Sequence, residues 1–196
     1  MKMQPKTTLR WRMADMAGTG IEQVNVVMPE TNINSPHEIL LATDIPSPQA
    51  SALDIGWTAE DVNLFTLLLD KMLGFPEGAG DLEIDDPEII DILHVVAAAH
   101  FIPPASAQGI LAADINTVLS ELDVADLVAI NTQDGFKSAI ICGLDSIEAL
   151  CVLLEPIEGI EGQHDLDIYD TILVNKHSIL PAEFGNVVPD DECLLN

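Results

Sequence analysis

Residues 127–154, LVAINTQDGFKSAIICGLDSIEALCVLL, decide how the C-terminal half of this chain is predicted to fold. Short apolar runs alternate there with turn residues such as Asp134-Gly135, a pattern typical of antiparallel strands joined by tight turns. Two further runs follow a long acidic loop. The five runs are 127–130, 136–142, 147–154, 168–174 and 177–180. They predict a small antiparallel β-barrel or curled sheet, SH3-like or similar, over residues 124–184, followed by a C-terminal tail at 185–196.

Upstream of this stretch the apolar residues recur at helical spacing. One helix is predicted to begin after Thr58, which can cap its first turn, and to end at Gly74. A second is predicted to begin at Pro87, a residue favoured at the first helical position. The apolar spacing predicts a third helix over about residues 105–122. We therefore expect a small three-helix region at residues 51–123.

The first fifty residues differ from the rest because five prolines interrupt them. Proline breaks regular structure, so there is room only for short elements, a helix within residues 6–17 and a strand within residues 21–28. Such a segment cannot form a core of its own. We expect residues 1–50 to be an extended arm that lies across its own body or a neighbouring molecule. The predicted fold class is therefore α+β, with an extended N-terminal arm, a three-helix region and a C-terminal barrel.

The charge of the chain is divided unevenly along its length. Four of its seven basic residues precede the first acidic residue, Asp15. From residue 13 onward only three basic residues stand against thirty-three Asp and Glu. The basic residues of the arm are Lys2, Lys6, Arg10 and Arg12. A basic arm attached to an acidic body favours head-to-tail attraction between copies.

The composition excludes several classes of protein. A net charge of −26 repels phosphate backbones and disfavours direct nucleic-acid binding. A hydrophobic fraction of 48% argues against disorder, while no apolar run reaches the roughly 18 residues of a membrane span. Three cysteines without close pairing argue against a disulfide scaffold, and no secretory signal is apparent. We expect a location in a virion if the protein is viral, and otherwise in the cytoplasm.

Two acidic clusters are candidates for binding. The first, within residues 77–91, resembles a calcium loop but has Asp86 and Ile92 where Gly and Glu are required, so its acids are expected to be solvated or to cap a helix. The second lies in a glycine-containing loop and could be solvated or could dock a basic arm. Its candidate residues are Glu155, Glu158, Glu161, Asp165 and Asp167.

No motif points to catalysis. His94 and His100 are six residues apart on a predicted helix and so do not share a face as a zinc pair would. Cys142 and Cys151 lie on consecutive predicted strands and are expected to be small buried residues. No phosphate-binding glycine loop is present. We therefore predict no catalytic residue, no cofactor and no metal, and a protein that is not an enzyme.

Two functional hypotheses follow. The first is a non-enzymatic structural subunit of a large symmetric assembly, with a bacteriophage virion protein (capsid, decoration or neck component) as the best example. Its partners would be copies of itself and other assembly proteins, or basic protein surfaces, and not a membrane. The residues predicted to bind a partner are Lys2, Lys6, Arg10, Trp11 and Arg12 of the arm and the five acids of the second cluster. The alternative is an acidic mimic of DNA that inhibits a nuclease or another nucleic-acid-binding complex.

Overall fold

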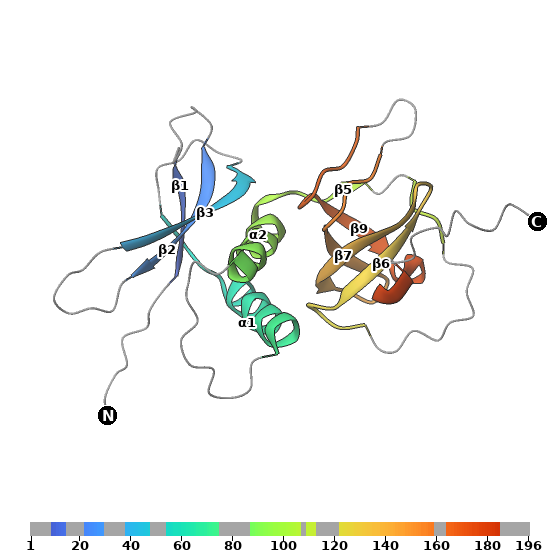
Figure 1. Cartoon of the computed structure of the whole chain (residues 1–196), viewed down its shortest axis with the longest axis horizontal. Helices are drawn as coiled ribbons and strands as arrows, with labels where there is room; N and C mark the ends of the chain where they lie inside the picture. Colours follow the sequence, from blue (N-terminus) through green and yellow to red (C-terminus); the bar gives the residue numbers. More distant parts are fainter. Residues whose placement is uncertain are drawn as a thin grey trace, which may run out of the picture. The chain divides into compact units, whose positions relative to one another are not determined.

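The computed structural model describes residues 9–14, 22–29, 38–47, 54–74, 87–106, 109–112, 122–158 and 164–184. The chain divides into two compact units, Met1–Pro103 and Pro104–Asn196 (Figure 1). Each unit has its own sheet.

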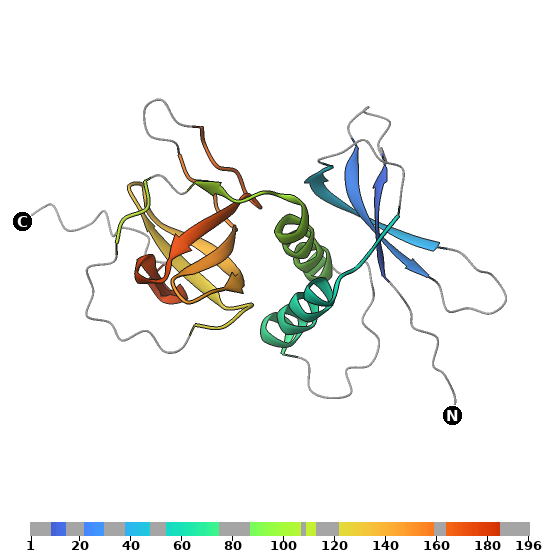
Figure 2. The same cartoon turned by 180° about the vertical axis from the view of Figure 1, so that it is seen from behind.

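The N-terminal unit contains a four-stranded antiparallel sheet in the order β3-β2-β1-β4. Its strands are β1 (Arg10–Ala14), β2 (Gln23–Pro29), β3 (Glu38–Pro46) and β4 (Ile55–Gly56). Trp11 pairs with Val26 and Met13 with Val24, and all four side chains are buried. Helices α1 (Ala59–Leu73) and α2 (Pro87–Phe101) lie on one side of this sheet, as the two opposite views in Figures 1 and 2 show. The other side carries Arg10 and Arg12, and because none of the described helices lies against it we call it the open face.

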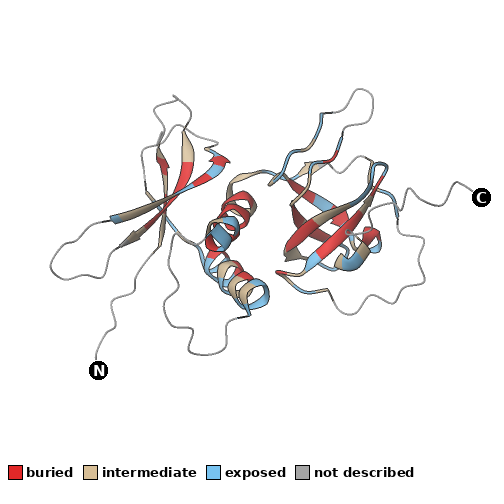
Figure 3. Cartoon of the chain, in the orientation of Figure 1, coloured by how far each residue is buried: buried red, intermediate tan, exposed pale blue. Residues whose placement is uncertain are grey.

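Both helices follow signals that are visible in the sequence, and their predictions are confirmed. Thr58 and Asp61 form a capping box at the start of α1, and Gly74 ends the helix in the left-handed conformation, with φ 59°. Residues 92–98 of α2 are all buried, which matches their nearly continuous apolar sequence (Figure 3). Among the described residues, no helix has the length and hydropathy that a membrane crossing requires.

The C-terminal unit contains a six-stranded sheet in the order β10-β6-β7-β8-β9-β5. Its strands are β5 (Ala105–Ser106), β6 (Leu127–Thr132), β7 (Gly135–Leu144), β8 (Glu148–Leu153), β9 (Thr171–Asn175) and β10 (Ile179–Pro181), with short 3-10 helices at Lys176–Ser178 and Ala182–Phe184. All neighbours pair antiparallel except β5 and β9, which are parallel. Alternate residues of these strands, including Ile130, Ile141, Cys151 and Ile172, form an aliphatic core.

The predicted fold class is wrong in its N-terminal part. Residues 10–14 are a strand within the sheet and not part of an extended arm or a helix. The reason is a period of two, in which Trp11 and Met13 point to the core while Arg10 and Arg12 do not. The strand predicted within residues 21–28 is present as β2, and β3 and β4 complete the sheet from residues that the prediction left irregular.

The predicted division into a three-helix region at residues 51–123 and a small barrel at residues 124–184 is also wrong. Ala105–Ser106 is strand β5, and Ile110 forms an isolated bridge with Thr132, so residues expected to begin a third helix belong to the second sheet. Residues 107–108 and 113–121 lie outside the described part, as does the tail 185–196. The strands predicted near 127–130, 136–142 and 147–154 are confirmed, but the sheet is larger than the predicted five strands.

Candidate functional site

The open face of the N-terminal sheet carries four charged side chains that contact one another. Arg12 donates from Nε and Nη2 to the two carboxylate oxygens of Asp54, both at 2.7 Å, and Arg10 Nη1 donates to Asp54 at 2.8 Å. Glu38 accepts from Arg10 Nη2 at 2.6 Å and from Arg12 Nη1 at 2.8 Å. These four residues are called the arginine cluster. Its paired geometry is the forked arrangement that guanidinium and carboxylate groups prefer.

The strand order explains why these side chains meet. Arg10 and Arg12 are two residues apart on β1 and therefore share a face. Asp54 directly precedes β4, which pairs with β1, and Glu38 begins β3 at the far edge of the sheet. Arg10 and Arg12 are predicted from the sequence to bind a partner, whereas Asp54 and Glu38 are not, since only the strand pairing brings these two acids to the arginines.

The arginine cluster is electrically neutral and partly solvated. Hydrogen bonds from Arg12 and then Arg10 hold the pKa of the Glu38 carboxyl below its ordinary value, and the hydrogen bond from Arg12 does the same for the pKa of Asp54. The same contacts raise the pKa of the Arg12 guanidinium. The side chain of Asp54 is 20% exposed and that of Glu38 is 42% exposed, so water weakens these attractions. The cluster fixes geometry and balances charge more than it stabilises the unit.

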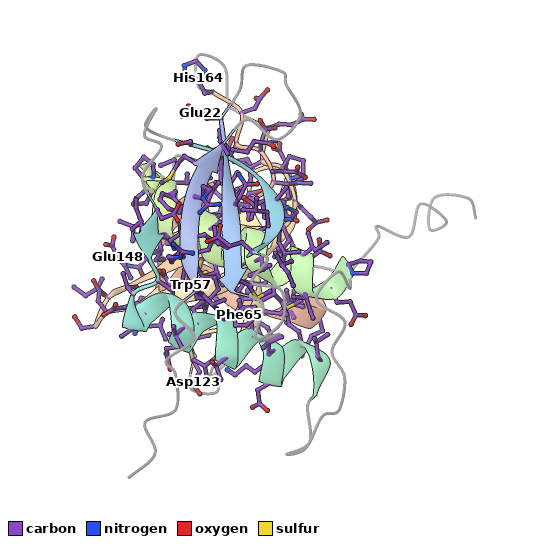
Figure 4. All side chains as sticks on the ribbon, turned by 90° about the vertical axis from the view of Figure 1, so that its left-hand side faces the viewer. Glu22, Trp57, Phe65, Asp123, Glu148 and His164 are labelled. Atoms are coloured by element: carbon purple, nitrogen blue, oxygen red, sulfur yellow. The ribbon has the colours of Figure 1, made fainter. Side chains whose placement is uncertain are left out.

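The opposite face of β1 is an aromatic core. The Trp11 ring is fully buried, stacks on Trp57 with ring centroids 4.7 Å apart, and meets Phe101 edge-on at 5.5 Å. Trp57 in turn meets Phe65 of α1 edge-on at 5.4 Å, and Figure 4 labels these two residues beside the helix. Trp11 was predicted to bind a partner, and the structure places it inside its own unit.

Asp61 links this aromatic core to both helices. Its carboxylate accepts from Trp11 Nε1 at 3.1 Å and from the Thr58 amide at 2.9 Å, and its other oxygen lies 2.9 Å from His100 Nδ1. Burial alone would raise the pKa of Asp61, but the hydrogen bonds from His100, Thr58 and Trp11 outweigh it, and the pKa lies below its ordinary value. The carboxylate is thus kept charged and holds α1, α2 and β1 together.

The other candidate residues are dispersed. His94 is buried near Asp44 and Asp91, each at 3.9 Å, and burial lowers its pKa against the attraction of these two carboxylates. His94 and His100 therefore have separate surroundings. Among the described residues no three His, Cys, Asp or Glu side chains are grouped closely enough to hold a metal ion.

The acids predicted to bind a partner in the C-terminal unit have different roles. Glu155 accepts the Ser138 amide at 2.7 Å, which ties the loop to β7. Glu158, Asp165 and Asp167 are exposed near a bridge between Ile157 and Leu166. Glu161, Lys2, Lys6 and the acids of residues 77–86 lie outside the described residues. Binding of a partner by this set stays a prediction.

Cys142 and Cys151 lie on the neighbouring strands β7 and β8, as predicted. Cys151 is in the aliphatic core, and burial raises the pKa of its thiol to about 12. Burial, and then the nearby Cys151, raise the pKa of Cys142 as well. Neither thiol has the lowered pKa of a reactive cysteine.

No family model matches this chain, and no curated protein matches it either.

Proposed function

We propose that this chain is a non-enzymatic structural subunit that associates with copies of itself in a symmetric assembly, with a bacteriophage virion as the first setting to test. The observation that carries the proposal is the arginine cluster. In a chain of net charge −26, it gives the open face of the N-terminal sheet two positive and two negative side chains in mutual contact.

Charge decides which surface two copies can share. Two bodies of the same strong negative charge repel each other, and the repulsion is smallest where opposite charges are already paired. The same side of the sheet carries Leu40, which is half-buried, and Ala42, which is exposed, whereas Val27 of β2, the partner of Leu40, is fully buried. A neutral face that mixes forked ion pairs with aliphatic side chains suits a contact between subunits. This contact needs no free N-terminal arm, because the arginines bind carboxylates of their own unit.

The placement of the acids supports this proposal over the DNA-mimic alternative. A mimic needs carboxylates in rows at the surface. Several described carboxylates instead accept backbone amides in turns: Asp126 from Asp123 at 2.8 Å, Asp145 from Ile147 and Glu148 at 2.6 Å each, and Asp170 from Asp167 at 2.8 Å. These acids have a local structural role that favours turn formation.

The proposal is tested by light scattering on the purified full-length chain at about 10–100 µM in low and high salt. We expect an oligomer of defined mass that is favoured by salt, because salt screens repulsion between acidic copies. Arg12→Glu should weaken association, since it destroys the neutral cluster, while Lys71→Glu on helix α1 makes the same change of charge in the same unit and should weaken it less. A chain that is monomeric in every condition contradicts the proposal, and tight inhibition of a nuclease by that monomer would favour the DNA mimic.

A further inference from the structure

Strand β3 is the longest of the four strands that lie at the edges of the two described sheets. It has nine residues and ends the order β3-β2-β1-β4, and among the described residues it pairs only with β2. The strands at the other three sheet ends, β4, β5 and β10, have two or three residues each. An edge strand presents unpaired amide and carbonyl groups that can pair with another chain.

A bulge divides β3 into two parts. Asn25 pairs with Ala42 and Gln23 with Pro46, so the β2 strand advances by two residues while β3 advances by four. Thr43 Oγ1 donates to the Val24 carbonyl at 2.6 Å and so satisfies a group at the irregular place in the ladder. Beyond the bulge Ile45 is buried. The regular part of β3 is therefore residues 38–42, because bulges bend a strand and interrupt its pairing.

The sequence of residues 38–42 does not protect this part of the edge from pairing with another chain. Natural edge strands are commonly guarded by lysine, proline or bulges, and here Asp44, Pro46 and the bulge guard only the C-terminal half. Residues 38–42 read EILLA and carry one charge, that of Glu38, which both arginines of the cluster bind. This segment therefore adds no unbalanced charge at the edge, so a second copy can approach it despite the net charge of the chain.

We propose that Glu38–Ala42 pairs antiparallel with the same segment of a second copy, across a two-fold axis at Leu40. The two sheets then form one sheet of eight strands. In this register Glu38 faces Ala42 of the second copy and Ile39 faces Leu41, so no like charges stand opposite each other. The contact is self-complementary, as a two-fold interface must be. This inference rests on the proposed function and adds the β3 edge, which borders the open face, to the surface through which copies associate.

The first test measures amide hydrogen exchange of the full-length wild-type chain over a series of protein concentrations. We expect alternate amides within residues 38–42, those that do not face β2, to exchange more slowly as dimers form, because the new ladder protects them. If dimers form while protection appears only elsewhere, the inference is overturned and the proposed self-association stands. If the chain stays monomeric throughout, both fail.

The second test uses charge placed opposite Glu38. Ala42 is exposed, so Ala42→Glu should fold, and it sets a carboxylate against Glu38 of the second copy twice in each dimer. We expect its dimer dissociation constant to rise at least about tenfold. Val62→Glu on helix α1 is the matched control, since Val62 is 49% exposed in the same unit and the change of charge is the same. Equal dissociation constants for the two variants would overturn the inference.

Discussion

Asp61 of α1 is a buried carboxylate that connects three parts of the N-terminal unit, because it contacts Trp11 of β1, the Thr58 amide and His100 of α2. We expect Asp61→Asn to lower the free energy of unfolding by about 2 kcal/mol at pH 7, because an amide group cannot replace a charged acceptor of three groups. Chemical denaturation measures this change. Glu60→Gln is the control, because Glu60 is exposed on the same turn and its loss should cost less than about 0.5 kcal/mol.

A comparison of the wild-type chain with Asp61→Asn at different pH values gives a second prediction. The pKa of Asp61 is lower in the folded state than in the unfolded chain, where it is about 3.9. Its contribution to stability is therefore complete above the unfolded pKa and is lost as the pH falls through the folded one. The difference in unfolding free energy between wild type and Asp61→Asn should be constant above about pH 5 and should shrink below about pH 4. A difference that grows in acid would show that the carboxylate is not held in its charged form.

The thiols of Cys142 and Cys151 give a third prediction. A thiol with a pKa of about 12, such as Cys151, holds very little thiolate at pH 8. We expect iodoacetamide to modify both residues at least about 100-fold more slowly in the folded chain than in denaturant. Mass spectrometry of peptides distinguishes them from Cys193. Rapid modification of Cys151 in the native protein would contradict its full burial, and rapid modification of the half-buried Cys142 would contradict the raised pKa of its thiol.

At the scale of elements, the end of helix α1 requires a residue that tolerates the left-handed backbone conformation. Gly74 ends α1 at φ 59°, and its amide donates to the Asp70 carbonyl at 3.0 Å. Gly74→Ala should destabilise the unit by about 1 kcal/mol, since a side chain disfavours this conformation. Gly56→Ala is the control, because nothing lies within 4 Å of its added Cβ and its φ is not in the left-handed region. Equal melting temperatures for the two variants would show that the cap contributes nothing.

The elements also show what sequence alone could predict. Capping residues and apolar spacing act locally, so α1, α2 and the strands near residues 127–154 were predicted correctly. β1 was missed because its five residues are too few for a clear period, and their burial depends on Trp57 and Phe101 far along the chain. Within the arginine cluster, Arg10 and Arg12 were selected from charge alone. Asp54 and Glu38 could not be predicted as members of the cluster, because they are distant from the arginines in sequence and reach them only through strand pairing.

For the whole molecule, the excess of negative charge governs stability in salt. Repulsion among thirty-three acidic side chains favours expansion, and salt screens it. We expect the melting temperature to rise by about 3 °C between low and high salt, which is equivalent to about 1 kcal/mol for a chain of this size. Circular dichroism at several protein concentrations separates this effect from association. A melting temperature that falls as salt is added would show that ion pairs such as those of the arginine cluster outweigh the general repulsion.

The parallel pair of β5 and β9 has a consequence for biosynthesis. Ala105 and Ser106 stand at the beginning of the C-terminal unit, yet their strand partners are Ile172 and Leu173 near its end. A ribosome adds about 5–20 residues per second, so β5 emerges several seconds before the strand it needs. During this interval the nascent unit cannot complete its sheet, and it is then that a chaperone would be of most use.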